Sequence, residues 1–176
     1  MGVRTADICD DHEALLSEGT LRVLPGSWLS FGGIECFSGP LVTLRAHGCN
    51  RELRERLAEP GNGQVLLIDS DGHPEALLGG NLAQLAQRNG WAGVIVHGHV
   101  RDAHELRALP IGIKAGGTWP VRSRNARGGA FNTELNIYGC SAQPGEWLYA
   151  DADGILISQF KLGVSSADPK YSAAGD

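Results

Sequence analysis

The chain has 176 residues, a formal net charge of −5 and 42% hydrophobic residues, which is ample for one domain with its own core. The acidic balance argues against broad nucleic-acid binding, because that normally needs a basic surface. No apolar stretch is long enough to span a bilayer, and the N-terminus lacks a basic-then-apolar signal pattern. We therefore expect a cytoplasmic protein with neither a membrane nor a nucleic acid as a direct partner.

The glycine and cysteine content narrows the class further. The 25 glycines and 6% aromatic residues favour a turn-rich α/β or β-rich protein over a helical bundle. The cysteines form no Cys-x-x-Cys pair, so neither a zinc knuckle nor a redox dithiol is indicated. We expect reduced, structural thiols at all four positions, which are Cys9, Cys36, Cys49 and Cys140.

Hydrophobic periodicity predicts helices and strands in mixed order. The expected elements are a helix over about Thr5 to Leu16, strands near Leu41 to Arg45 and Val65 to Asp69, a helix from Asn81, a strand from Ala92, a helix over Asp102 to Ala108, and strands near Ile113, Leu135 and Ile155. Residues 161–176 are rich in Ser, Ala, Gly and Asp and should form a flexible tail after a single domain over residues 1–160.

A glycine pair opens the second of these helices. Gly79, Gly80 and Asn81 precede apolar residues at helical spacing, which predicts Asn81 as the N-cap and Gly90 as the stop. The free N–H groups at such a start can bind a carboxylate or phosphate, and glycine lets the ligand approach the backbone. A capping role alone is the simpler alternative for this turn taken by itself.

An arginine and an aspartate follow the next strand. The apolar run Val94 to Val96 predicts a buried strand, and Arg101 and Asp102 come after it, twenty-one positions beyond Gly80. Ligands of parallel sheets gather at the C-terminal ends of the strands. A cation, a carboxylate and a helix N-terminus would thus face one anionic ligand. Asp102 could instead serve only as the N-cap of its own helix.

Several stretches of the chain resemble one known family. Its aldolases carry a glycine, twenty residues, Arg-Asp, two residues and an acid, a pattern met by Gly80, Arg101, Asp102 and Glu105. Further matching stretches are Thr5 to Asp10, Ser30 to Gly33, Phe37 to Pro40, Gly63 to Asp69 and Tyr149 to Ile155. The chain resembles, from about Thr5 to Ser158, the class II 4-hydroxy-4-methyl-2-oxoglutarate and 4-carboxy-4-hydroxy-2-oxoadipate aldolases and the regulators of ribonuclease E activity A.

The resemblance implies a function, a fold and roles for individual residues. The implied activity is cleavage of 4-hydroxy-4-methyl-2-oxoglutarate-type substrates to pyruvate and a 2-keto acid, with oxaloacetate decarboxylation. Asp102 matches the residue that anchors a divalent cation, Mg²⁺ or Mn²⁺; Arg101 matches the residue that contacts the keto or enolate oxygen. Gly79, Gly80, Asn81 and Leu82 match the segment that binds the substrate carboxylate. The implied architecture is an α/β fold, a swivelling β/β/α domain, assembled as a homotrimer or a dimer of trimers with sites between subunits.

The chemistry agrees with these roles. One carboxylate with several waters is a usual Mg²⁺ site, and a 2-keto acid can complete the octahedron. The cation then polarises the carbonyl while Arg101 faces the developing enolate charge. Lys114 is the only lysine before Lys161, and nothing in the sequence places it beside Arg101, so a Schiff-base mechanism is the poorer interpretation.

Other functions within the resemblance need separate weighing. A non-catalytic protein that binds and inhibits ribonuclease E or a similar enzyme remains the alternative. The intact Arg101-Asp102 pair favours the enzyme, because the family's regulators need not keep the aspartate. Menaquinone methyltransferase activity has also been attached to this family, but the sequence has no Gly-x-Gly-x-x-Gly loop after a strand.

The sequence leaves open the role of two further groups, a histidine pair on the strand from Ala92 and an arginine-rich loop. His97 and His99 are alternate strand residues that would share one face, but the family usually has other residue types there. Arg122, Arg124 and Arg127 crowd a glycine-rich segment with the composition of an exposed loop. This loop could attract a dicarboxylate or contact a neighbouring subunit, although a solvated loop is the simpler interpretation. The sequence leaves the physiological substrate open.

Overall fold

Four parallel strands form the centre of the computed structural model, which describes residues 4–124 and 128–163. Leu41 pairs with Val65, Val65 with Gly93, and Gly93 with Gly112. The strands are β3 (Phe37–Arg45), β4 (Val65–Asp69), β5 (Gly93–Val100) and β6 (Gly112–Thr118). All of β4 is buried, as its continuous apolar sequence requires for a strand covered on both faces.

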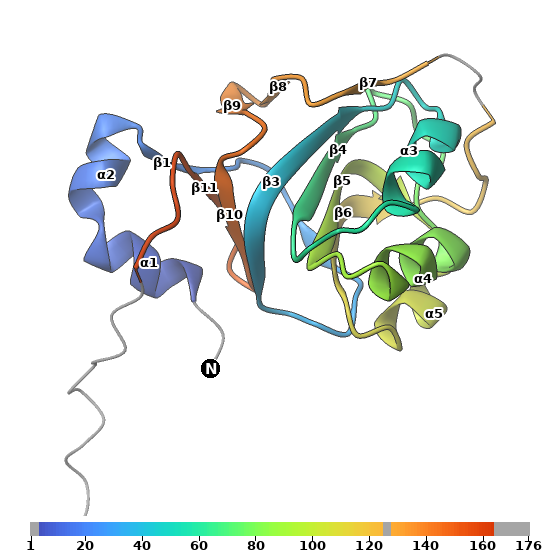
Figure 1. Ribbon diagram of the computed structural model, residues 1–176, viewed down its shortest axis with the longest axis horizontal. Helices are drawn as coiled ribbons and strands as arrows, with labels where there is room; N and C mark the ends of the chain where they lie inside the picture. Colours follow the sequence, from blue (N-terminus) through green and yellow to red (C-terminus); the bar gives the residue numbers. More distant parts are fainter. Residues whose placement is uncertain (1–3, 125–127, 164–176) are drawn as a thin grey trace, which may run out of the picture.

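Antiparallel strands extend the sheet on both sides, in the order β1-β11-β10-β3-β4-β5-β6-β2 (Figure 1). The added strands are β1 (Leu21–Val23), β2 (Leu29–Ser30), β10 (Trp147–Ala150) and β11 (Ile155–Ser158). A short strand, β7 (Ala130–Phe131), pairs with the end of β3. A separate hairpin joins β8 (Leu135–Ile137) to β9 (Cys140–Ala142).

The helices lie in two groups on opposite sides of the molecule (Figure 1). One group packs on the parallel strands: α3 (Asn50–Leu57), α4 (Gly80–Arg88) and α5 (Ala103–Arg107). Leu53, Leu82 and Leu106 of these helices pack in one core with Leu66 and Val94 of the sheet. The other helices, α1 (Thr5–Asp11) and α2 (Glu13–Glu18), lie beside β1 and β11.

A second core lies on the other face of the parallel strands. Leu67 and Ile95 point into it, and Leu135 and Ile137 of the β8–β9 hairpin cover it together with Leu148 of β10. The parallel strands therefore have one apolar core toward the helices and one toward the second β layer, and a third apolar cluster joins Ile8 of α1 to Leu21 of β1 and Leu156 of β11. This arrangement confirms the predicted α/β fold with its β/β/α layering.

Local details differ from the sequence predictions. The N-terminal helix is interrupted at His12, whose φ of −131° and ψ of 38° are not helical. Helix α4 begins at Gly80 with Gly79 at the N-cap, so the prediction of Asn81 as N-cap is wrong. Gly90 follows the C-cap Asn89 with a φ of 75°, the left-handed conformation that glycine favours at a helix end.

Some predictions fall on parts of the chain without described structure. These are most of the expected tail, residues 164–176, and Arg127 of the arginine-rich loop. Among the described helices, none has both the length and the apolar character needed to cross a membrane.

Candidate active site

The start of α4 and the end of β5 are held side by side by backbone contacts. Leu78 forms a parallel bridge with Val100, and its carbonyl accepts the N–H of Arg101 at 2.9 Å. The residues that follow each partner, Gly79 in one segment and Arg101 in the other, consequently lie next to each other. The structure thus brings together the two segments that the sequence spacing had linked.

Asp102 connects the two segments through its side chain. Its Oδ2 accepts a hydrogen bond from the N–H of Gly80 at 3.0 Å. The residue occupies the N-cap position of α5 with φ 59° and ψ 38°, yet its side chain makes no cap hydrogen bond to that helix. Asp102 is thus the N-cap residue of α5, as the sequence alternative held, but its carboxylate bonds to the start of α4 and not to its own helix.

Arg101 lies beside this carboxylate without being tightly engaged by it. Its Nε is 3.7 Å from Asp102 Oδ2, and the two side chains are each 36% exposed. A loose ion pair in contact with water contributes little to stability, about 0 to 1 kcal/mol. Within the described residues, neither Nη atom of Arg101 makes a hydrogen bond, so the planar end of the guanidinium can meet a ligand.

Both glycines leave room for acidic side chains. A Cβ on Gly79 would lie 2.7 Å from Asp102 Oδ2 and 3.1 Å from Arg101 Cγ. A Cβ on Gly80 would collide with Oε2 of Glu105. Gly79 has an ordinary φ of −137°, so space around the site, and not backbone conformation, is what requires glycine there. Three charged side chains thus surround the first turn of α4.

Asn81 and Leu82 contribute differently to this turn. Asn81 is exposed, whereas the side chain of Leu82 is buried in the core beneath α4. Leu82 can therefore offer a ligand only its backbone. The first N–H groups of a helix have no partner within it, and here the N–H of Gly80 is already bonded to Asp102. The N–H groups of Asn81 and Leu82 are left for an anion.

The donor set fits a hydrated magnesium-type cation. No group of three or more His, Cys, Asp or Glu side chains in the described residues could enclose a metal ion. A closed zinc site is thus not built here. Mg²⁺ needs fewer protein ligands, commonly one or two carboxylates with waters and substrate oxygens. Asp102 supplies one such carboxylate, and its exposed position leaves space for the other ligands.

Lys114 lies away from this site. It is 1% exposed on β6, and its Nζ donates to Ser30 Oγ at 2.9 Å. Burial lowers the pKa of its amine. Among the described residues its amine bonds to Ser30 and not to any group of the Arg101–Asp102 pair, which agrees with the weak case for a Schiff-base lysine.

The two histidines of β5 have other neighbours. His97 forms a hydrogen bond with Asp69, and the ring centroids of His99 and Trp119 are 5.9 Å apart. Arg122 and Arg124 are exposed, as expected for a surface loop. The pairing of Asp69 with His97 was not among the features predicted from the sequence. Its signal was the register between neighbouring parallel strands, which opposes these two residues.

Relatives with curated names match nearly the whole chain. A protein of Paraburkholderia phytofirmans is 47% identical over 163 residues, 92% of this chain and 99% of the relative. A protein of Arabidopsis thaliana is 45% identical over 161 residues, 91% of this chain and 97% of the relative. Their names are "Putative 4-hydroxy-4-methyl-2-oxoglutarate aldolase" and, for the plant protein, the same name with the number 3.

Solved structures give a second view of the same relationship. The RNA-processing inhibitor RraA from Thermus thermophilis matches with a TM-score of 0.84 and 41% identity, over 93% of this chain and 96% of that chain. A Geobacillus kaustophilus protein titled S-adenosylmethionine: 2-dimethylmenaquinone methyltransferase matches with a TM-score of 0.84 and 40% identity, over 91% and 97%. The sequence model of the RraA-like family, described as Aldolase/RraA, matches residues 5–157. With this match and relatives above 40% identity across its length, the chain belongs to the RraA-like family.

Proposed function

We propose that this protein is a divalent-metal-dependent class II pyruvate aldolase. It cleaves 4-hydroxy-4-methyl-2-oxoglutarate-type substrates to pyruvate and a second 2-keto acid, and it decarboxylates oxaloacetate. The observation that carries the proposal is the meeting of Arg101, Asp102 and the glycine-opened start of α4 at one place. The names of the 47% and 45% identical relatives support the same reaction class.

Each residue has a distinct role in this proposal. The free N–H groups at the start of α4 bind the substrate carboxylate, which orients the 2-keto group toward Arg101. The guanidinium of Arg101 binds the carbonyl oxygen and stabilises it as the enolate charge develops. Asp102 holds Mg²⁺ or Mn²⁺, and the chemistry that such a cation supplies is Lewis-acid polarisation of the carbonyl.

The hydrogen bond from Gly80 fixes the orientation of Asp102. One carboxylate oxygen accepts the Gly80 N–H, which leaves the other oxygen to face a cation. Such a fixed ligand orientation matters because supporting hydrogen bonds typically change metal affinity or activity by about 10- to 100-fold. The link between Gly80 and Asp102 thereby couples the carboxylate-binding turn to the cation anchor.

A pyruvate-release assay tests the proposal. Purified protein is assayed with 4-hydroxy-4-methyl-2-oxoglutarate before and after treatment with a chelator, and then after addition of Mg²⁺ or Mn²⁺. We expect pyruvate release to disappear with chelator and to return with either cation. Activity that survives complete chelation would overturn the metal-dependent mechanism, and no pyruvate release under any condition would overturn the aldolase assignment.

A second candidate function is binding and inhibition of ribonuclease E or a similar enzyme. The TM-score of 0.84 to a structure titled as an RNA-processing inhibitor favours this candidate. Inhibition of this kind depends on a protein surface and not on a cation at Asp102. Ribonuclease cleavage would therefore be inhibited equally by the unmodified protein and by Asp102→Asn, which separates this function from the aldolase.

A further inference from the structure

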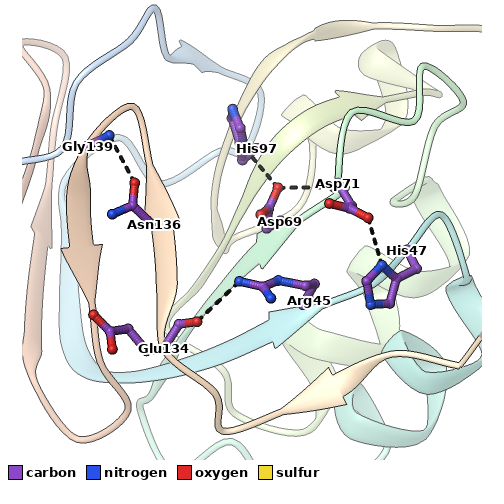
Figure 2. A network of polar contacts seen from close by, with 8 residues as sticks. All are labelled: Arg45, His47, Asp69, Asp71, His97, Glu134, Asn136 and Gly139. Carbon is purple, nitrogen blue, oxygen red and sulfur yellow. Dashed lines mark hydrogen bonds and ion pairs between the residues drawn. The ribbon is translucent and has the colours of Figure 1, made fainter.

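A carboxylate–imidazole pair lies at the C-terminal ends of β4 and β5, apart from Arg101 and Asp102. Asp69 and His97 oppose each other in the strand register, and His97 Nδ1 is 2.9 Å from Asp69 Oδ1 (Figure 2). Leu67 and Ile95, two positions earlier on each strand, point into the core opposite α3, α4 and α5. Alternation along the strands places the pair on that same face.

The environment of Asp69 keeps it ionised. Asp69 as a whole residue is 8% exposed, and its Oδ1 also accepts a hydrogen bond from the N–H of Asp71 at 3.0 Å. Burial opposes ionisation, but the hydrogen bonds from His97 and from the Asp71 backbone hold the pKa of this carboxyl below its usual value. An ionised carboxylate only accepts hydrogen bonds, so Nδ1 of His97 must carry the proton. In the neutral ring, the lone pair then resides on Nε2.

Nε2 of His97 lies on the accessible side of the ring. The His97 side chain is 27% exposed, and within the described residues Nε2 makes no hydrogen bond. Figure 2 shows the second nitrogen of the ring on the side away from Asp69. With a carboxylate bonded to Nδ1 and no partner on Nε2, the imidazole is oriented for proton transfer or nucleophilic attack.

Two aromatic rings flank the imidazole. The Tyr138 ring meets that of His97 edge-on, with centroids 5.0 Å apart and an interplanar angle of 79°, and the Trp28 ring lies 6.1 Å away. Tyr138 stands at the tip of the β8–β9 hairpin, in the left-handed conformation with φ 50°. Its ring also covers Gly26, where a Cβ would come within 2.9 Å. Aromatic surfaces beside the His97 ring suit a flat, apolar ligand.

A neighbouring pair provides an internal comparison. His47 Nδ1 lies 2.8 Å from Asp71 Oδ2, a similar distance, and Figure 2 shows both pairs linked through the backbone of Asp71. The Asp71 side chain is 53% exposed, however, against 12% for Asp69. A carboxylate in water orients and polarises its histidine less than a buried one. We therefore expect reactivity at His97 and not at His47.

We propose that His97 is a nucleophilic imidazole, positioned by Asp69, that hydrolyses small aryl esters at a second site on the face of the sheet opposite α4 and α5. Nε2 attacks the ester carbonyl carbon, and the bond to the aryloxide breaks, so that the aryloxide leaves with the electron pair. Water then hydrolyses the acyl-imidazole to the carboxylic acid, restores the neutral ring and releases one proton to solvent. This activity goes beyond the proposed aldolase and needs no metal.

Steady-state hydrolysis of p-nitrophenyl acetate tests the proposal. Because the exposed thiol of Cys36 would also attack this ester, every variant is compared in a Cys36→Ser background. We expect His97→Gln to lower the rate of p-nitrophenolate release at least about tenfold, since positioned acid–base groups typically contribute about 10² to 10⁴. His47→Gln should leave that rate unchanged. An equal rate in His97→Gln would overturn the proposal.

The positioning role of Asp69 has its own readout. Nitrogen-15 NMR of the imidazole rings in the unmodified protein should show His97 with its proton on Nδ1. Asp69→Asn should shift this tautomer toward Nε2–H and lower ester hydrolysis together with it. A ring with its proton on Nε2 in the unmodified protein would overturn the assigned role of Asp69. This measurement does not depend on whether a variant folds.

Discussion

The N–H of Gly80 donates a hydrogen bond to Asp102 Oδ2 at 3.0 Å, across twenty-two positions of sequence. Asp102 reaches this partner because its backbone is left-handed, with a φ of 59°. Such a conformation is uncommon outside glycine and typically costs about 1 to 3 kcal/mol, although aspartate tolerates it better than most residues. The turn directs the carboxylate to the start of α4 and away from the helix that Asp102 itself precedes.

Gly79→Ala should damage the site while sparing the fold. The added methyl would lie 2.7 Å from Asp102 Oδ2, so the carboxylate must move, whereas the φ of −137° accepts alanine. A displacement of about 1 Å in an active site can cost about 10²-fold. We expect pyruvate release to fall at least tenfold with little change in melting temperature.

Gly154→Ala is the matched control for this variant. A Cβ at Gly154 would meet no atom within 4 Å, and this glycine is not among those with positive φ. It should retain both stability and pyruvate release. Equal activity in Gly79→Ala would show that the closeness of Gly79 to Asp102 has no part in the reaction.

Arg101→Lys should be severely impaired. A single ammonium on a flexible stem cannot reproduce a planar guanidinium directed at the enolate oxygen. Loss of one such donor typically lowers kcat by about 10² to 10³. The quantity to measure is kcat/KM for pyruvate release, with Arg88→Lys as the control because Arg88 is exposed in the last turn of α4. A rate near that of the unmodified protein would assign Arg101 a structural role.

The sequence predicted the meeting of Gly80, Arg101 and Asp102 because parallel crossover units place helix starts beside strand ends. It also predicted β4, whose bounds Val65 to Asp69 are those observed, since a short apolar run bounded by turn-forming residues is typical of a buried strand. The bounds of β4 follow from the local apolar pattern, and the meeting of α4 with the end of β5 follows from the general topology of parallel crossover units.

The features that the sequence did not reveal depend on strand pairing between distant residues or on single backbone angles. The strands β2 and β7, of two residues each, are too short to show a period. The helix interruption at His12 could not be predicted, because no proline or glycine lies beside it in the sequence. The Asp69–His97 pair arises from the register of β4 against β5, which sequence periodicity does not specify. The side-chain target of Asp102 likewise follows from one backbone angle.

Asp151 should make stability depend on pH in the acidic range. It is 3% exposed and accepts hydrogen bonds from Thr5 N at 2.7 Å, Thr5 Oγ1 at 2.6 Å and two further backbone N–H groups. Burial opposes ionisation, yet these bonds lower the pKa of the carboxyl below its usual value. Its stabilisation is present above the ordinary carboxyl pKa of about 3.9 and is lost as pH falls through the lower folded value.

Asp151→Asn should therefore flatten this acidic dependence. We expect it to reduce the free energy of unfolding near neutral pH by about 1 to 3 kcal/mol, because buried donors lose a charged acceptor. Urea denaturation at a series of pH values measures both effects, and the exposed Asp153→Asn serves as control. An unchanged slope below pH 5 would mean that other carboxylates produce the acid sensitivity.

The chain should assemble as a homotrimer or a dimer of trimers. Family resemblance is the main reason, and several large apolar side chains exposed in the single chain are available for contacts: Trp119, Val121 and Phe131. Light scattering coupled to size-exclusion chromatography measures the mass directly. A stable and fully active monomer would contradict the expectation, and it would also exclude a site shared between subunits.

One site should perform both retro-aldol cleavage and oxaloacetate decarboxylation. Both reactions break a bond to the carbon next to the pyruvyl carbonyl and leave the same enolate, so a site complementary to that enolate accelerates both. Asp102→Asn should depress the two rates in parallel, because it removes the only charged cation anchor proposed, and pyruvate should inhibit both reactions competitively. The ratio of the two kcat/KM values across Arg101→Lys and Asp102→Asn is the measurement. If Asp102→Asn removed one activity and left the other untouched, the second activity would have to arise at a different site.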